Sequence, residues 1–178
     1  MIATARLILR RWEDRDRPVF HSHCQDPRVM EHLGPLQSRE ATDAQLDRQN
    51  IFFDPLGYCF WAVERREDAT LLGFCGLKPG AEGTPIEHGV EIGWRFGRDH
   101  WGKGYAREAA RASLDWAWAN LDDERVWSIT TLANVRSWGL MERIGMYRCA
   151  DLDFDHPNVA EDSPLKRHIT YRIDRPAQ

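Results

Sequence analysis

The stretch from residue 90 to residue 121 places a short strand, a glycine-bearing loop and a long helix in direct succession. Residues 90–96 (VEIGWRF) have the length of a strand, and residues 105–121 carry a stripe of small and apolar side chains at helical spacing. The loop between them holds Gly102 and Gly104, which let the backbone approach a ligand closely. Because a helix N-terminus has unpaired N–H groups and the positive end of the helix dipole, this junction predicts a phosphate-binding site.

The charge of the chain favours a small anionic ligand over a long one. The chain has 24 Lys and Arg against 28 Asp and Glu, a formal net charge of −4, which argues against a general nucleic-acid partner. Residues 98–107, however, contain three basic side chains, Arg98, Lys103 and Arg107, and one acidic side chain, Asp99. The loop is therefore locally basic inside an acidic chain.

The remaining elements extend this junction into one domain over residues 1–178, a length that suits a single hydrophobic core. Periodicity, caps and turn residues predict strands at 5–12, 58–65, 70–78, 125–133, 146–154 and 168–173. They also predict one or two short helices within 14–33 and single helices at 39–54 and 135–144. The order of these elements predicts an α/β (α+β) domain. Its mixed, mostly antiparallel sheet has about seven strands, with helices on both faces.

Cysteine usage and hydropathy indicate a cytoplasmic protein without a membrane partner. No apolar run approaches the ~18 residues that a membrane-spanning helix needs, and the first sixteen residues fill with charge, unlike a signal peptide. The four cysteines form no CxxC pair, so we expect reduced, buried thiols. His21 and His23 are the closest histidine pair and lack partners at ligand spacing, so we expect no metal site.

A nucleoside triphosphatase is one interpretation of the loop. Residues 97–103 fit the start of the GxxxxGK[ST] pattern, but Gly104 stands where Ser or Thr would hold Mg²⁺. Glu91 and Arg95 are also unusual for a buried parallel strand. We therefore disfavour this interpretation.

From residue 90 to residue 145 the chain resembles the GCN5-related N-acetyltransferase (GNAT) superfamily. Residues 101–106 (WGKGYA) align with its Q/R-x-x-G-x-G/A motif, except that Trp101 replaces the usual Gln or Arg. That departure is similar to the RimJ/RimL-like branch, which acetylates N-terminal alanine or serine of ribosomal proteins. Further similar stretches are residues 4–12 (TARLILRRW), 26–27 (DP), 91–94 (EIGW), Asn134-x-x-Ser137, 144–146 (IGM), 156–157 (HP), 163–168 (SPLKRH) and 171–172 (YR).

The resemblance implies a fold and a co-substrate. Strands 90–96 and 125–133 would splay apart, and acetyl-CoA would lie in the cleft between them, with no metal required. Its pantetheine arm would pair near Trp94 and Phe96, and its pyrophosphate would rest on the N–H groups of residues 101–106. The implied cofactor-binding residues are Trp94, Phe96, Arg98, His100, Trp101, Gly102, Lys103, Gly104, Tyr105, Ala106, Asn134 and Ser137. The alternative for Arg98, His100 and Lys103 is a solvated loop, and for Asn134 a plain helix N-cap.

Two residues are candidates for catalysis. Glu91 faces away from Val90 and Ile92 on the strand beside the cleft, so it could assist deprotonation of the amine; the alternative is an ion pair with a neighbouring strand. Many superfamily members have a Tyr at the position of Met141, and Met cannot donate a proton. Ser137 resembles the Ser that donates a proton to the thiolate in the ribosomal-protein branch. The alternative interpretation is that Ser137 is a small residue that only packs on the helix face.

The resulting hypothesis is an acyltransferase that moves an acetyl group from acetyl-CoA to a primary amine by direct transfer in a ternary complex. Backbone N–H groups near Trp94 would hold the developing negative charge. An α-amine, with a pKa near ~8, needs less help to deprotonate than a Lys amine at ~10.4. The acceptor, a protein N-terminus or a small molecule, and the oligomeric state, with a homodimer as one option, stay open. The alternative function is a non-catalytic acyl-CoA-binding module.

Overall fold

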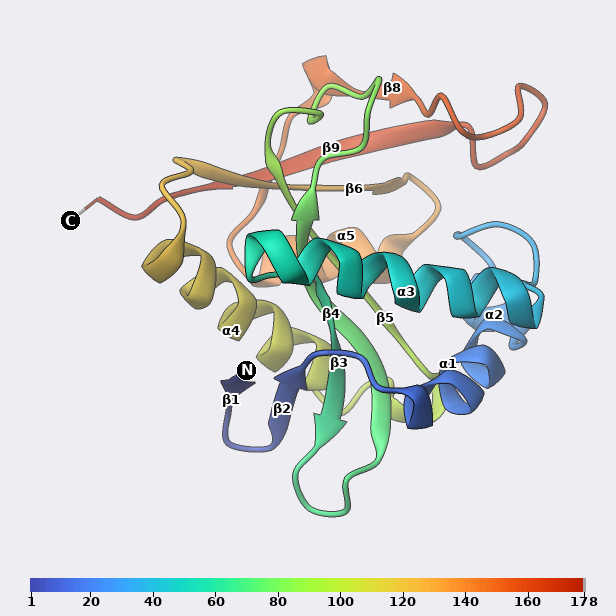
Figure 1. The fold of residues 1–178 in the computed structure, drawn as a ribbon. Helices are drawn as coiled ribbons and strands as arrows, with labels where there is room; N and C mark the ends of the chain where they lie inside the picture. Colours follow the sequence, from blue (N-terminus) through green and yellow to red (C-terminus); the bar gives the residue numbers. More distant parts are fainter. Residues whose placement is uncertain (178) are drawn as a thin grey trace.

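A nine-stranded sheet organises the part of the chain that the computed structural model describes, residues 1–177 (Figure 1). The strands are β1 (Ile2–Ala3), β2 (Leu7–Arg10), β3 (Phe60–Arg65), β4 (Leu71–Pro79), β5 (Val90–Phe96), β6 (Arg125–Thr131), β7 (Tyr147–Arg148), β8 (Phe154–Asp155) and β9 (Arg167–Asp174). The helices are α1 (Arg17–Cys24), α2 (Pro27–Met30), α3 (Arg39–Leu56), α4 (Tyr105–Asn120) and α5 (Val135–Arg143), with 3₁₀ turns at Asp14–Asp16, Arg98–His100 and Ala150–Leu152.

The sheet is mixed and mostly antiparallel, as the sequence predicts. Its order is β1-β2-β3-β4-β5-β6-β9-β7, β8 pairs with β9, and β5–β6 is the parallel pair. One expectation is wrong: residues 146–154 form no continuous strand but the two-residue β7, a 3₁₀ turn and the two-residue β8. The carboxylate of Asp153 accepts the N–H of Thr170 at 3.3 Å, so a side chain replaces the backbone partner there.

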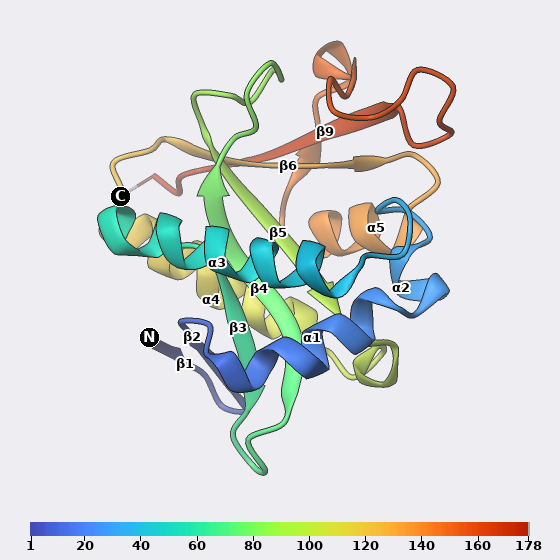
Figure 2. The ribbon, with the colours of Figure 1, turned by 45° about the vertical axis from the view of Figure 1, so that its right-hand side comes forward.

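Strands β5 and β6 separate after two residue pairs. Val90 pairs with Val126 and Glu91 with Trp127, and beyond them the two strands share no ladder. The Ser128 hydroxyl donates to the Ile92 carbonyl at 2.9 Å, just past the last pair. In Figures 1 and 2, β6 and β9 cross above the upper ends of β3–β5 at a steep angle. The splayed central strands are therefore confirmed, and the outer part of the β5 edge faces a gap in the ladder.

Helices cover both faces of the sheet, with α1–α3 on one face and α4 and α5 on the other (Figure 2). On the α4 face, Ala109, Ala110 and Ala117 are fully buried, so small side chains bring this helix close to the strands. On the other face, the rings of Phe60 and Phe74 stack with centroids 5.0 Å apart beneath α1 and α3. Two apolar layers thus hold β5 between them.

Local signals end the helices where the sequence predicts. The Ser38 hydroxyl accepts the N–H of Ala41 at the start of α3, and Gly57, at φ +74°, ends that helix in a left-handed conformation. The Asn134 side chain accepts the N–H of Ser137 at 3.3 Å and caps α5. Each such cap contributes about 1 kcal/mol to stability.

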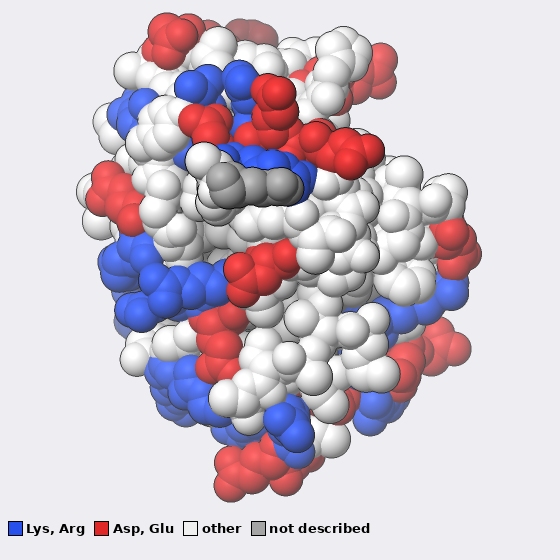
Figure 3. All heavy atoms as spheres, turned by 90° about the vertical axis from the view of Figure 1, so that its left-hand side faces the viewer, with Lys and Arg blue, Asp and Glu red and all other residues white. Residues whose placement is uncertain are grey.

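The surface of the domain carries charges of both signs. In Figure 3, Lys and Arg groups alternate with Asp and Glu groups over the face that is drawn. The four thiols, Cys24, Cys59, Cys75 and Cys149, are buried and unpaired with one another. None of the helices within residues 1–177 is long and apolar enough to cross a membrane.

Candidate active site

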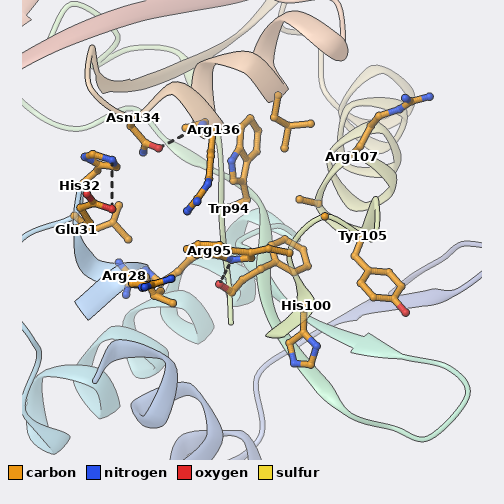
Figure 4. A pocket seen from close by; sticks show the side chains of 18 of the residues that line it. Arg28, Glu31, His32, Trp94, Arg95, His100, Tyr105, Arg107, Asn134 and Arg136 are labelled. Atoms are coloured by element: carbon orange, nitrogen blue, oxygen red, sulfur yellow. Dashed lines mark hydrogen bonds and ion pairs between the residues drawn. The ribbon is translucent and has the colours of Figure 1, made fainter. Parts of the chain in front are cut away.

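A cavity of about 530 Å³ opens where β5 and β6 separate (Figure 4). Its walls come from β5, the loop before α4, the first turns of α4 and α5, and α2 with the residues that follow it. Ten of the residues that the resemblance implies as cofactor contacts line it: Trp94, Phe96, His100, Trp101, Gly102, Gly104, Tyr105, Ala106, Asn134 and Ser137. Segments separated by more than a hundred residues thus meet around one hollow.

The glycine loop presents backbone donors to this cavity. Gly102 and Gly104 adopt φ values of +73° and +81°, a region that favours glycine. Gly104 is the N-cap of α4 and supplies no side-chain acceptor, so the first N–H groups of this sixteen-residue helix keep their capacity for a ligand. The indole N–H of Trp101 donates to the Phe96 carbonyl at 2.8 Å and fixes the loop against β5. This geometry suits an anion.

Arginines give the cavity a strong positive charge. The five that line it, facing Glu31 as the single lining carboxylate, are Arg28, Arg95, Arg107, Arg136 and Arg143. Within residues 1–177 none of these five forms an ion pair with a carboxylate. The Arg136 guanidinium lies 4.6 Å over the Trp101 ring, so α5 and the loop meet across the cavity.

Sequence reasoning named none of these five arginines as a cofactor contact, although it counted Arg107 toward the basic charge of the loop. The spacing of Arg136 and Arg143 on α5, two turns apart, was a usable signal, as was Arg107 in the first turn of α4. Nothing local marks Arg28, and the one local sign for Arg95 is that a charged residue is unusual in a buried strand. The tertiary structure brings Arg28 of α2 and Arg95 of β5 to the wall of the same cavity.

Two of the predicted cofactor contacts lie outside the cavity wall. Arg98 Nε is 3.8 Å from Asp26 Oδ2, and the side chain of Lys103 is exposed while its carbonyl accepts from Arg6 at 3.0 Å. Their direct contact with a cofactor stays a prediction. His100 does line the cavity, and burial, followed by the charge of Lys103, lowers the pKa of its imidazole.

The first turn of α5 places Asn134 and Ser137 side by side at the cavity. The amide of Asn134 is used at both ends, since Oδ1 caps the helix and Nδ2 donates to Thr130 Oγ1 at 3.0 Å. The helix-cap role is thereby confirmed. No hydrogen bond joins the Ser137 hydroxyl to another residue within 1–177, while Met141, one turn on, is 1% exposed in the core. Ser137 is thus the available hydroxyl on this wall.

Glu91 lies away from the cavity wall. It is buried, and its carboxylate is 2.5 Å from Lys78 Nζ on β4, directly opposite in the ladder. The alternative of an ion pair with a neighbouring strand is therefore what the structure contains. Burial raises the pKa of the Glu91 carboxyl, and the Lys78 ammonium offsets part of that rise. Its role as a base stays a prediction.

The α2 end of the cavity holds titratable groups that the sequence did not single out. Glu31 and His32 both line the wall, with His32 Nε2 3.9 Å from Glu31 Oε2. Figure 4 shows them with Arg28 on the side of the pocket opposite Tyr105 and Arg107. Within residues 1–177, no group of three or more His, Cys, Asp or Glu side chains could hold a metal ion. The cavity therefore has a phosphate-type end at α4 and a mixed polar end at α2.

Comparison with known proteins gives a consistent family match. The family model described as an acetyltransferase (GNAT) domain matches residues 6–147. The Bacillus subtilis protein YkkB is 33% identical over 149 residues, which covers 82% of this chain and 84% of YkkB.

Solved structures share the fold over almost the whole chain. A GNAT-family acetyltransferase from Bacillus anthracis has a TM-score of 0.79 at 25% identity, covering 98% of each chain. RimL, a ribosomal L7/L12 alpha-N-protein acetyltransferase solved with coenzyme A, has a TM-score of 0.75 at 15% identity, covering 96% of this chain and 95% of RimL. The likeness to RimL is one of fold alone.

Proposed function

The chain belongs to the GNAT acetyltransferase family, and from that premise we propose that it is an N-acetyltransferase that transfers the acetyl group of acetyl-CoA to a primary amine. The observation that carries this proposal is the basic cavity at the split between β5 and β6, with the uncapped start of α4 in its wall. Direct transfer within a ternary complex is part of the same proposal, and the presence of residues from α4 and from α2 in one cavity wall supports it. A cytoplasmic location belongs to the same proposal.

The residues present fit acetyl-CoA, which supplies the acetyl thioester when bound. The N–H groups of residues 101–106 would hold its phosphates together with Arg107, Arg136 and Arg143, which form no ion pair within residues 1–177. Trp94 and Phe96 offer apolar contact beside the β5 edge that lacks a ladder partner. The presence of coenzyme A in RimL, on the same fold, supports this use of the cavity.

Two proton movements accompany the transfer. The Ser137 hydroxyl, free of other hydrogen bonds within residues 1–177, would donate to the leaving sulfur at the α5 wall. Glu91 is the predicted acceptor of the amine proton, although Lys78 holds its carboxylate. Glu31 and His32 form a second candidate acceptor because they lie in the cavity wall. Glu91→Gln and His32→Gln separate the two candidates. Only replacement of the residue that acts as the base should lower kcat, and most strongly at pH values below the pKa of the acceptor amine.

Calorimetry and a thiol-release assay test the proposal. We expect acetyl-CoA to bind without Mg²⁺, and CoA thiol to be released in the presence of at least one member of a panel of primary amines. Tight binding of Mg-ATP in place of acetyl-CoA would overturn the family-based function. Binding of acetyl-CoA without thiol release across the panel would instead identify a non-catalytic acyl-CoA-binding module.

A further inference from the structure

The Arg95 guanidinium is partly buried and forms no ion pair with a carboxylate within residues 1–177. It lies on β5 above the rings of Phe20 and Phe74, 5.7 Å and 5.5 Å from their centroids. Its Nη1 donates to Cys24 Sγ at 3.2 Å and to Gln37 Oε1 at 3.5 Å, both weak contacts, and its Nε is buried with no hydrogen-bond partner. Burial lowers the pKa of this guanidinium, which nevertheless stays protonated.

Arg10, a buried arginine on β2, shows what full compensation of such a cation looks like. Arg10 donates to both carboxylate oxygens of Asp16, at 2.7 and 2.8 Å, and to Glu64 at 3.0 and 2.8 Å. Taking a cation out of water costs several kcal/mol unless an anion and hydrogen bonds compensate it. Arg95 lacks any such carboxylate among residues 1–177 but lines the cavity, so the missing anion can arrive as part of a ligand.

The position of Arg95 separates it from the phosphate-type end of the cavity. Trp94 and Phe96 pack with the core on the α4 face, whereas Arg95 contacts residues on the α1–α3 face. Arg28, Glu31 and His32 lie at this same end (Figure 4). The donors suited to pyrophosphate are at the start of α4, on the opposite side of the pocket.

We propose that Arg95, assisted by Arg28 at the rim, binds a carboxylate of the acceptor, so that the acceptor is a primary amine bearing a carboxylate close to the amino group. Glu31, the single lining carboxylate, is placed to attract the ammonium end of such a molecule. A polyamine, which has only cationic groups, would instead meet two uncompensated arginines. This inference rests on the proposed acetyltransferase function and specifies its substrate class.

The test compares acceptors in pairs that differ only in the carboxylate. Free amino acids are assayed against their amides, and peptides with an acidic second residue against peptides with its amide, so the two arms distinguish a free amino acid from a protein N-terminus. Thiol release gives kcat/KM for each acceptor with wild type, Arg95→Met, Arg95→Lys and the control Arg48→Gln. Arg48 is exposed on α3 and makes no ion pair within residues 1–177.

For one of the two acceptor series, the free amino acids or the peptides, we expect Arg95→Met to lower kcat/KM of the carboxylate-bearing acceptor by about 10- to 100-fold. This factor corresponds to the free energy of one charge-assisted hydrogen bond. The amide acceptor should change by less than about twofold, and comparing the two ratios cancels the different basicity of their amines. Arg95→Lys keeps the charge but loses the planar fork, so an intermediate loss is expected. Arg48→Gln should change neither acceptor. The KM for acetyl-CoA should be unchanged in every variant.

A binding measurement gives a second readout. An N-acetyl amino acid should raise the Tm of the wild type and not that of Arg95→Met. If Arg95→Met and Arg95→Lys lower both members of each pair equally, or neither, while thiol release continues, the carboxylate subsite is wrong and the acetyltransferase function stands. If wild type releases no thiol with any acceptor, the proposed function itself fails.

Discussion

Replacing Gly102 by Ala isolates the contribution of the glycine loop to ligand binding, and Gly57→Ala is its matched control. Gly102 has φ +73° and Gly57 φ +74°, and at both positions an added Cβ meets no atom within 4 Å. Gly102 lies in the cavity wall, whereas Gly57 ends α3 away from it. The two changes therefore impose the same backbone strain, and only one of them places a methyl group where a ligand would lie.

The strain sets the expected loss of stability. A left-handed conformation costs an L-residue about 1–2 kcal/mol relative to glycine, so both variants should lose about that much free energy of unfolding. For Gly102→Ala, a phosphate pushed off the loop also loses a charge-assisted hydrogen bond, worth about 1.5–3 kcal/mol. The Kd for acetyl-CoA should then rise about 10- to 100-fold, while Gly57→Ala leaves it unchanged.

Urea unfolding measures the first effect and calorimetry the second. Both variants should shift the unfolding midpoint by the same amount at an unchanged slope. Equal acetyl-CoA affinity in the two variants would refute a phosphate position on residues 101–106. A midpoint shift in one variant alone would refute the strain argument.

Three further outcomes follow from other parts of the structure. Ser137→Ala should slow thiol release about tenfold or more with an unchanged Kd for acetyl-CoA, and a wild-type rate would leave water as the proton donor. Glu91→Gln leaves Lys78 without its carboxylate, so stability should fall by about 3 kcal/mol or more; an unchanged urea midpoint would contradict this. Burial lowers the pKa of His23 to about 4, from 6.5. Between these two pH values His23 is therefore protonated in the unfolded chain and neutral in the folded chain. The free energy of unfolding is therefore unaffected by His23 above pH 6.5 and falls by about 3 kcal/mol as the pH drops to 4. His23→Met should flatten that dependence of the urea midpoint, and an identical pH slope in both proteins would exclude His23.

The local structure could be predicted from short-range patterns. The bounds of β5 agree with the sequence, α4 ends within one residue of its predicted end, and Ser38 and Asn134 cap helices as expected. These features depend on side chains only a few residues apart, where periodicity and capping act. The prediction of a continuous strand over 146–154 failed because Asp153 accepts a hydrogen bond from the backbone N–H of Thr170, seventeen residues away. No short-range pattern shows such a contact.

The site divides in the same way. The sequence by itself determined the glycine loop at the start of α4 and the Asn134–Ser137 turn, because each is complete within a few consecutive residues. The tertiary structure alone decided that Lys78 stands opposite Glu91, and that Arg28 from α2 lines the same cavity as Arg95 from β5. Strand register and helix packing select which charges meet, and the pairing of charges in a low-dielectric interior determines which stay free for a ligand.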